Sequence, residues 1–262
     1  MATYLDDILA RHRAAAATDA RSTGELAERA RSMPPTRRFG DALRQGDRLA
    51  VISEIKRRSP SKGALAPHLD PTELARRYAN GGASCLSVLT DVDAFGGSPQ
   101  DLAAARAAVE LPVLRKDFTV SANDVCDTRL MGADCVLLIA AALDDAELDD
   151  FAALAADIGL DVLVEIHDEE ELERALATTS GELIGVNQRD LETFQVDQAR
   201  AVRMAGLMPA DTIRVAESGV RGRDDAVSLA AAGYHAVLVG EHLVTSADPA
   251  AALDALRVPR PG

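Results

Sequence analysis

Only three lysines occur among the 28 basic residues of this chain, and all the others are arginines. Lys56, Lys62 and Lys116 each follow a short apolar run that is typical of a β-strand. An ammonium group can give up its proton and act as a general acid, whereas a guanidinium in effect cannot. Three residues of one type can cluster by accident, so the surrounding sequence has to decide whether these lysines do acid–base chemistry.

Acidic, amide and hydroxyl residues accompany the lysines at the ends of the apolar runs. Glu54 and Lys56 are two positions apart in an extended run, so their side chains point to the same side. A solvated rim of charges explains any single position, but like charges that converge need a substrate or counter-ions between them. The other polar residues at these ends include Ser59, Arg115, Asp117, Glu165, His167, Asn187, Arg189, Asp190, Glu217 and Ser218.

Eight short apolar runs alternate with helical patterns from residue 48 onward, which is typical of βαβ units and a parallel sheet. Eight units predict an α/β fold of the (βα)8 TIM-barrel class, whose reactive groups lie at the C-terminal strand ends. A doubly wound open sheet is the alternative, but no glycine-rich dinucleotide turn follows the first run. The predicted strands are 49–55, 84–89, 112–114, 135–139, 161–165, 183–186, 212–216 and 236–239.

Helical patterns also precede the first strand. Residues 4–17 and 23–32 have helical character, and a further short helix is expected after the break at 33–36. Within the repeat, 71–80 and 144–158 are helical segments closed by glycine. We predict an N-terminal helical extension, residues 1–47, packed on a barrel domain of residues 48–262.

The bulk composition restricts the partners and the compartment. A formal net charge of −14 argues against nucleic acid and anionic membranes as partners. Three cysteines (Cys85, Cys126 and Cys135) are an odd number without metal-ligand spacing, which favours buried free thiols in a reducing compartment. We expect no signal peptide, because charged residues interrupt the first helical pattern, and no membrane span, because no apolar run approaches 18 residues. We expect a cytoplasmic protein, with a monomer among the possible oligomeric states, and no motif implies a metal or an organic cofactor.

Two glycines indicate the chemical class of the substrate. Gly219 and Gly240 follow the seventh and eighth predicted strands. Loops at these two positions often form the phosphate site of such barrels, because a glycine lets a ligand approach backbone N–H groups. The pair predicts a small phosphorylated substrate.

Six motifs, in order on six strand ends, together resemble the indole-3-glycerol phosphate synthase family. The resemblance implies a decarboxylating ring closure that converts 1-(2-carboxyphenylamino)-1-deoxyribulose 5-phosphate to indole-3-glycerol phosphate, with release of CO2 and water, in tryptophan biosynthesis. It covers the barrel and extends to the N-terminal helices. The motifs are SEIKRRSPSKG (53–63), FGGS (95–98), LRKDF (114–118), LVEIH (163–167), GVNQRDL (185–191) and AESGV (216–220).

The resemblance also implies a role for each matching residue. Lys116 corresponds to the general acid, held near Glu54 and Glu165, and Glu165 to a second proton-transfer residue. Lys56 corresponds to a residue that pairs with substrate anions and with Glu54. Two further residues that orient the substrate hydroxyls and the reacting carbonyl are Asn187 and Glu217. The implied lining of the anthranilate side is Ser59, Phe95, Phe118, Leu137, Arg189 and Leu191, and the implied phosphate cradle is Ser218, Gly219, Gly240 and Glu241.

Two departures from the family pattern affect these expectations. Glu241 stands where many relatives carry serine, and a carboxylate would repel a phosphate, so we expect its backbone N–H to serve while its side chain turns away. The segment 121–124 is more polar than expected, with Ser121 as a predicted helix cap. The alternatives are another phosphosugar barrel, such as phosphoribosylanthranilate isomerase, and a non-catalytic relative. The sequence does not divide the acid roles between Lys56 and Lys116.

Overall fold

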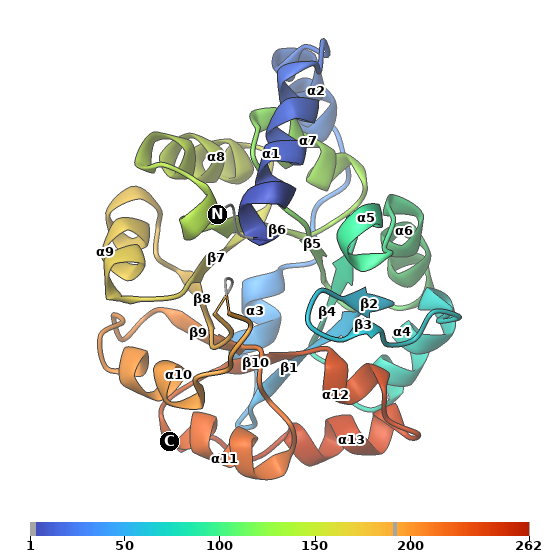
Figure 1. Ribbon diagram of the computed structural model, residues 1–262, viewed down its shortest axis with the longest axis vertical. Coiled ribbons are helices and arrows are strands. Elements are labelled where there is room, and N and C mark those ends of the chain that lie inside the picture. The colour runs from blue at the N-terminus through green and yellow to red at the C-terminus, as the bar shows by residue number, and fades with distance from the viewer. Residues whose placement is uncertain (1–3, 191–192, 262) are drawn as a thin grey trace.

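A closed barrel of eight parallel strands forms the centre of the computed structural model, which describes residues 4–190 and 193–261 (Figure 1). Each strand is hydrogen-bonded to two neighbours in the order β1-β10-β9-β8-β7-β6-β5-β4. The predicted (βα)8 barrel is therefore confirmed, and strand ends differ from the expected ones by at most two residues. The strands are β1 (Ala50–Ile55), β4 (Cys85–Leu89), β5 (Val113–Lys116), β6 (Cys135–Ile139), β7 (Asp161–Ile166), β8 (Leu183–Asn187), β9 (Ile213–Glu217) and β10 (Ala236–Val239).

Helices surround the barrel and cover its outer face (Figure 1). Their starts follow local capping chemistry: Asp70 accepts hydrogen bonds at the start of α4, where Pro71 occupies the first turn, and Asp144 forms a capping box at α8. The expected Ser121 cap is also present at α7. These helices are α4 (Pro71–Asn80), α5 (Val92–Phe95), α6 (Pro99–Ala108), α7 (Ala122–Leu130), α8 (Asp145–Asp157), α9 (Glu169–Thr178), α10 (Gln198–Ala205), α11 (Arg223–Ala231), α12 (Glu241–Val244) and α13 (Pro249–Leu256), with a 3-10 turn η1 (Ala140–Ala142).

Both faces of the barrel strands are buried, as expected for a parallel sheet under helices. All six residues of β1 are buried. The inner cluster includes Ile52, Leu114 and Leu137, and the outer cluster packs against the helices. The three cysteines are buried and free, as predicted. This aliphatic packing makes a rigid frame from which the strand-end side chains project.

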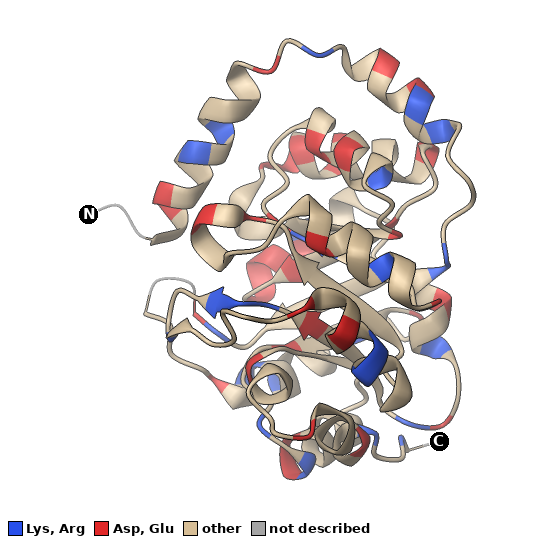
Figure 2. Cartoon of the chain, turned by 90° about the vertical axis from the view of Figure 1, so that its right-hand side faces the viewer, with Lys and Arg blue, Asp and Glu red and all other residues tan. Residues whose placement is uncertain are grey.

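Three helices precede the barrel: α1 (Tyr4–Ala17), α2 (Thr23–Arg31) and α3 (Phe39–Arg44). Figures 1 and 2 show α1 and α2 standing over one end of the molecule, and the buried face of α2 packs on α7. Phe39 and Leu43 of α3 join the inner cluster at the opposite, N-terminal end of the strands. The N-terminal helical extension is thus confirmed, while the domain division after residue 47 remains a prediction.

A small hairpin after β1 was not predicted from the sequence. Its strands, β2 (Arg58–Ser59) and β3 (Gly63–Ala64), are antiparallel and hold the intervening turn at the barrel mouth.

Among the described residues, none of the helices is long and apolar enough to cross a membrane.

Candidate active site

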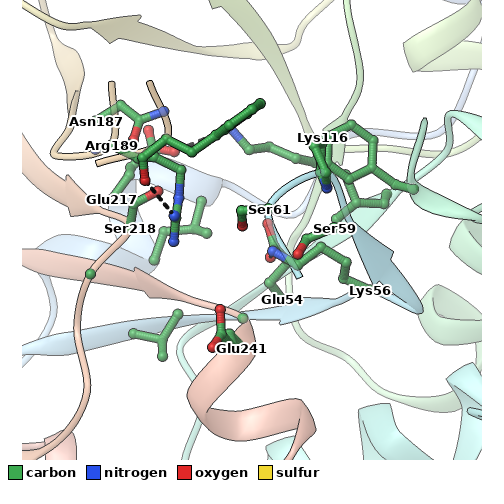
Figure 3. Close-up of a pocket in the computed structure, with 18 of the residues that line it drawn as sticks. Glu54, Lys56, Ser59, Ser61, Lys116, Asn187, Arg189, Glu217, Ser218 and Glu241 are labelled. Atoms are coloured by element: carbon green, nitrogen blue, oxygen red, sulfur yellow. Dashed lines mark hydrogen bonds and ion pairs between the residues drawn. The ribbon is translucent and has the colours of Figure 1, made fainter. Parts of the chain in front are cut away.

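A pocket of about 610 Å³ lies at the C-terminal ends of the barrel strands. Its wall includes side chains that come from β1, β5, β7, β8 and β9 (Figure 3). The rule that reactive groups collect at this end of a barrel therefore locates the site. Charged and amide groups in this wall include Glu54, Lys56, Lys116, Glu165, Asn187, Arg189 and Glu217.

Four of these residues form what we call the deep cluster: Lys116, Glu165, Asn187 and Glu217. The Lys116 ammonium makes an ion pair with Glu165 and lies 3.2 Å from Glu217 Oε2. Asn187 Nδ2 donates to Glu165 Oε1 at 2.9 Å. Both carboxylate side chains are only 2% exposed. One largely buried cation is therefore shared between two buried carboxylates.

The backbone leaves room for this cluster at Gly185 on β8. A Cβ at Gly185 would collide with the Glu217 carboxylate, so a side chain at this position would push Glu217 away from Lys116. Register explains the proximity, because Asn187 of β8 pairs with Glu217 of β9 at the ends of adjacent strands. The sequence predicted Lys116 near Glu165 and Glu54, whereas Glu217 is the second carboxylate that contacts it.

Charge coupling separates the titration of the two carboxylates. Burial acts to lower the pKa of Lys116, but the charges of Glu165 and Glu217 outweigh it, so the pKa lies above its usual value. Burial acts to raise the pKa of Glu165, but Lys116 and other donors hold it below its usual value. Burial, reinforced by the Glu165 charge, raises the pKa of Glu217 to about 7. The pocket thus combines a protonated lysine, Lys116, an ionised carboxylate, Glu165, and a carboxyl group, Glu217, whose pKa is near neutral pH.

Lys56 and Glu54 form a second ion pair on β1 and just after it. Their side chains point the same way, as the strand spacing predicted. A Cβ at Gly240 would collide with the Glu54 carboxylate and would lie 3.1 Å from Lys56 Nζ. Gly240 therefore permits close approach between the end of β10 and this pair.

Aromatic rings form the apolar part of the wall. The rings of Phe95 and Phe118 are stacked with centroids 6.3 Å apart, and Leu137 lies in the same pocket. Ser59 Oγ accepts a hydrogen bond of 3.3 Å from the backbone of Lys62. This arrangement offers a flat apolar surface beside the charged groups.

Arg189 is held by its own loop rather than extended freely into the pocket. Its backbone N–H donates to Asn187 Oδ1 at 3.0 Å, and its Nη1 donates to the Phe194 carbonyl at 3.0 Å. The predicted lining residue Leu191 lies outside the described residues.

The predicted phosphate cradle lies along another edge of the pocket. Ser218 and Gly219 both have positive φ, at 65° and 73°, a backbone state that is uncommon for serine. Lys62 and Glu241 face each other here at 3.6 Å and are 59% and 41% exposed; we call them the rim pair. We expected the Glu241 side chain to turn away from the cradle, and instead it lines the pocket and pairs with Lys62.

The profile of the family described as indole-3-glycerol phosphate synthase matches residues 5–256. The chain belongs to the indole-3-glycerol phosphate synthase family. It is 52% identical over 232 residues to the indole-3-glycerol phosphate synthase of Paenarthrobacter aurescens (strain TC1), covering 87% of this chain and 85% of the relative. It is 49% identical over 254 residues to the indole-3-glycerol phosphate synthase of Mycolicibacterium smegmatis (strain ATCC 700084 / mc(2)155), covering 96% of this chain and 93% of the relative.

A solved structure outside the indole-3-glycerol phosphate synthase family shares the barrel. Thiamine phosphate pyrophosphorylase from Pyrococcus furiosus superposes with a TM-score of 0.60 at 16% identity, covering 79% of this chain and 93% of that one. At this identity the likeness shows the fold alone.

The N-terminal helix of this synthase-family chain contributes residues that the sequence interpretation missed. Tyr4, Leu5 and Ile8 of α1 line the pocket, and the Tyr4 ring meets Phe194 edge-on at 5.8 Å. The helix is tied to the mouth by the run 11–13: Arg11 and His12 contact Asp91 at 2.7 and 2.8 Å. The basic run was visible in the sequence, but the shared partner of Arg11 and His12 lies about 80 residues away and the partner of Arg13, Glu147, lies 134 residues away.

One group near this helix has the residue types of a metal site. Single ligand atoms of His12, Asp91 and Asp117 all lie within 4.8 Å of one another. Arg11 already pairs with Asp91, and Arg115 pairs with Asp117 at 2.9 Å. These cations balance the carboxylates, so we interpret the group as the docking contact of α1 on the synthase barrel.

Proposed function

We propose that this protein is an indole-3-glycerol phosphate synthase that converts 1-(2-carboxyphenylamino)-1-deoxyribulose 5-phosphate to indole-3-glycerol phosphate, CO2 and water. The observation that carries the proposal is the deep cluster: one lysine between two buried carboxylates, at the base of a pocket with an aromatic wall. This arrangement supplies an acid and a base within reach of one substrate, as ring closure followed by dehydration requires.

Ring closure needs a proton on the ketone oxygen. The arene carbon that bears the carboxylate attacks the ketone carbon, and the π electrons of the C=O bond take the proton of Lys116. The bond to the carboxylate then breaks, CO2 leaves, and its electron pair restores the aromatic ring. The adjacent carboxylates raise the pKa of Lys116 and keep it protonated in the free enzyme, so the proton for the ketone oxygen is in place before the substrate binds.

Dehydration needs an acid and a base together. The hydroxyl leaves as water after taking a second proton, and Glu165 accepts the proton released as the double bond of the pyrrole ring forms. Because the substrate carboxylate departs as neutral CO2, each turnover takes up one proton from solvent. Glu217, with a pKa near 7, is suited to pass protons within the cluster at neutral pH.

Binding of the substrate anions is assigned to different groups. Lys56 would contact the substrate carboxylate in exchange for part of its pairing with Glu54. The stacked rings of Phe95 and Phe118 would face the anthranilate ring, and the backbone at Ser218, Gly219 and Gly240 would receive the phosphate. The division places proton transfer at the base of the pocket and anion binding at its edges.

The pathway, the cofactor requirement and the compartment of the enzyme belong to the same proposal. Indole-3-glycerol phosphate formation belongs to tryptophan biosynthesis, and the reaction is redox-neutral, so the chemistry needs no redox cofactor. We further propose a cytoplasmic monomer that binds no nucleic acid. The groups that this proposal uses all line one pocket of the barrel, so the proposed reaction calls on no residue of a second subunit.

A direct turnover assay tests the proposal. Purified protein is treated with a chelator and mixed with the deoxyribulose phosphate substrate, and the indole chromophore is followed by absorbance and fluorescence. The chain contains no tryptophan, so its own background is small. Stoichiometric formation of the indole product supports the proposal, and a folded protein that binds the substrate without turnover would contradict it.

A further inference from the structure

His167 lies directly behind the catalytic carboxylate of the deep cluster. It follows the last residue of β7, two positions after Glu165, and its Nε2 is 3.6 Å from Glu165 Oε1. Its side chain is 11% exposed. Of the described residues, the pocket wall includes Glu165 but not His167. His167 therefore faces Glu165 from outside the pocket wall.

The His167 ring is fixed from its other side by Glu171, in the first turn of α9. Glu171 Oε2 accepts the backbone N–H of His167 at 2.7 Å and lies 3.1 Å from its Nδ1. The Asp168 cap accepts the backbone N–H of Glu171 at 2.8 Å, which secures that turn. Because a carboxylate only accepts hydrogen bonds, Nδ1 carries a hydrogen whether the ring is neutral or charged.

This assignment decides what Nε2 presents to Glu165. In the neutral ring Nε2 would turn a lone pair toward a carboxylate, whereas in the cation it turns an N–H group. Burial and Arg200 act to lower the pKa of His167, but Glu171 and Glu165 outweigh them and raise it. Nε2 is buried and has no hydrogen-bond partner among the described residues. In the charged ring its N–H group would therefore be available to donate to Glu165.

We propose that His167 is a positioning residue that holds Glu165 as an oriented carboxylate while Lys116 delivers its proton, with Glu171 keeping the ring aimed. The inference rests on the proposed function, in which Lys116 must loosen its ion pair to protonate the substrate. Glu165 then loses its main cationic partner inside a buried site, which is costly for a carboxylate. Glu165 Oε1, which already accepts a hydrogen bond from Asn187, lies 3.6 Å from His167 Nε2, so a small rotation would bring it within hydrogen-bond distance of the ring.

Histidine NMR gives a test that does not depend on turnover. The chain has five histidines, and His167→Gln identifies the resonance of His167 by its loss. In Glu165→Gln the cation loses a carboxylate neighbour, so the pKa of His167 should fall by about one unit. Glu171→Gln should lower it as well. An unchanged pKa of His167 in Glu165→Gln would overturn the proposal.

Kinetics separates positioning from simple packing. His167→Ala should lower kcat about tenfold, the loss expected for one hydrogen bond to a charged group, with KM within about twofold of the parent. His167→Gln keeps an N–H donor at similar reach and should recover most of kcat. The matched control is His68→Gln at an exposed position, which should match the parent. Equal kcat in His167→Ala and the parent would contradict the proposal.

The two tests also distinguish the inference from the function on which it rests. A parent protein without turnover removes the proposed function, whatever the NMR titration shows. A parent that turns over, together with an alanine variant that does so equally well, removes only the role of His167. If His167→Ala fails to fold, the glutamine variants and the titration of Glu165→Gln still decide.

Discussion

Two lysine–carboxylate groups in one pocket differ mainly in burial. In the deep cluster, Lys116 is 16% exposed between carboxylates that are 2% exposed, whereas the rim pair Lys62–Glu241 is 59% and 41% exposed. Water and salt screen the rim pair, so its charges interact weakly, while the same charges in the deep cluster shift one another's pKa values strongly. Residue type alone therefore does not mark a proton-transfer group; burial beside a second carboxylate is the feature that supports the proposed role of Lys116.

The largest effect is expected from removing the buried ammonium. Lys116→Met should keep the fold and substrate binding but lose kcat by a factor of about 100 or more, the loss typical of a positioned general acid. Steady-state assays of the indole product measure kcat, and circular dichroism checks the fold. Lys62→Met is the matched variant at the rim and should change kcat little. Similar losses in both variants would remove the distinction between the two groups.

An intermediate effect is expected at Lys56, which is as buried as Lys116, each being 16% exposed, but makes its ion pair with Glu54 alone. Lys56→Met should raise KM about tenfold or more, because hydrogen bonds to charged groups contribute about 1.5–3 kcal/mol. Its kcat should fall less than that of Lys116→Met. Initial rates over a range of substrate concentrations separate the two constants. A lost kcat at unchanged KM would instead make Lys56 an acid and reverse the division of roles.

The pH dependence should also come from the deep cluster. Below about pH 7 Glu217 is protonated and Lys116 balances Glu165; above it a second carboxylate ionises, which repels the anionic substrate and holds the ammonium proton more tightly. The value of kcat/KM should therefore decline as pH rises through about 7. Profiles of kcat/KM against pH for the parent and Glu217→Gln test this, and the variant should lose that ionisation. An unchanged midpoint in the variant would assign the titration elsewhere.

The smallest effect is expected at the rim. Glu241→Ser removes a carboxylate beside the proposed phosphate position, so KM should fall by about two- to fivefold, within the range of about 1 kcal/mol for an exposed charge. The value of kcat should stay unchanged. Measuring KM at low and at high salt adds a check, because salt screens the Glu241 charge and should reduce the difference in KM between the variant and the parent. A higher KM in Glu241→Ser would show that the carboxylate helps to hold the site open for substrate.

Local pattern was sufficient to predict the barrel but not the details around its mouth. The strands follow apolar runs bounded by turn residues, and Glu54 and Lys56 share a side because the strand period requires it. The hairpin β2–β3 has two-residue strands, too short to produce a periodic pattern. The short helices α5 and α12 have the same limitation.

Long-range geometry explains what the sequence left open in the site. Glu217 reaches Lys116 across the barrel, from a strand that is not adjacent to β5, and only closure of the sheet brings them together. The placement of α1 depends on ion pairs between residues such as Arg13 and Glu147, more than 130 positions apart. No local signal marks such a pair.

The most direct test of the central claim is the turnover of Lys116→Arg, measured together with its affinity for the substrate. Arginine keeps the positive charge but in effect does not release its proton. If the deep cluster acts by proton transfer, the variant should bind substrate within about a few-fold of the parent and lose turnover about as fully as Lys116→Met. Turnover near that of the parent would show that charge alone suffices at this position and would contradict the assignment of Lys116 as the acid.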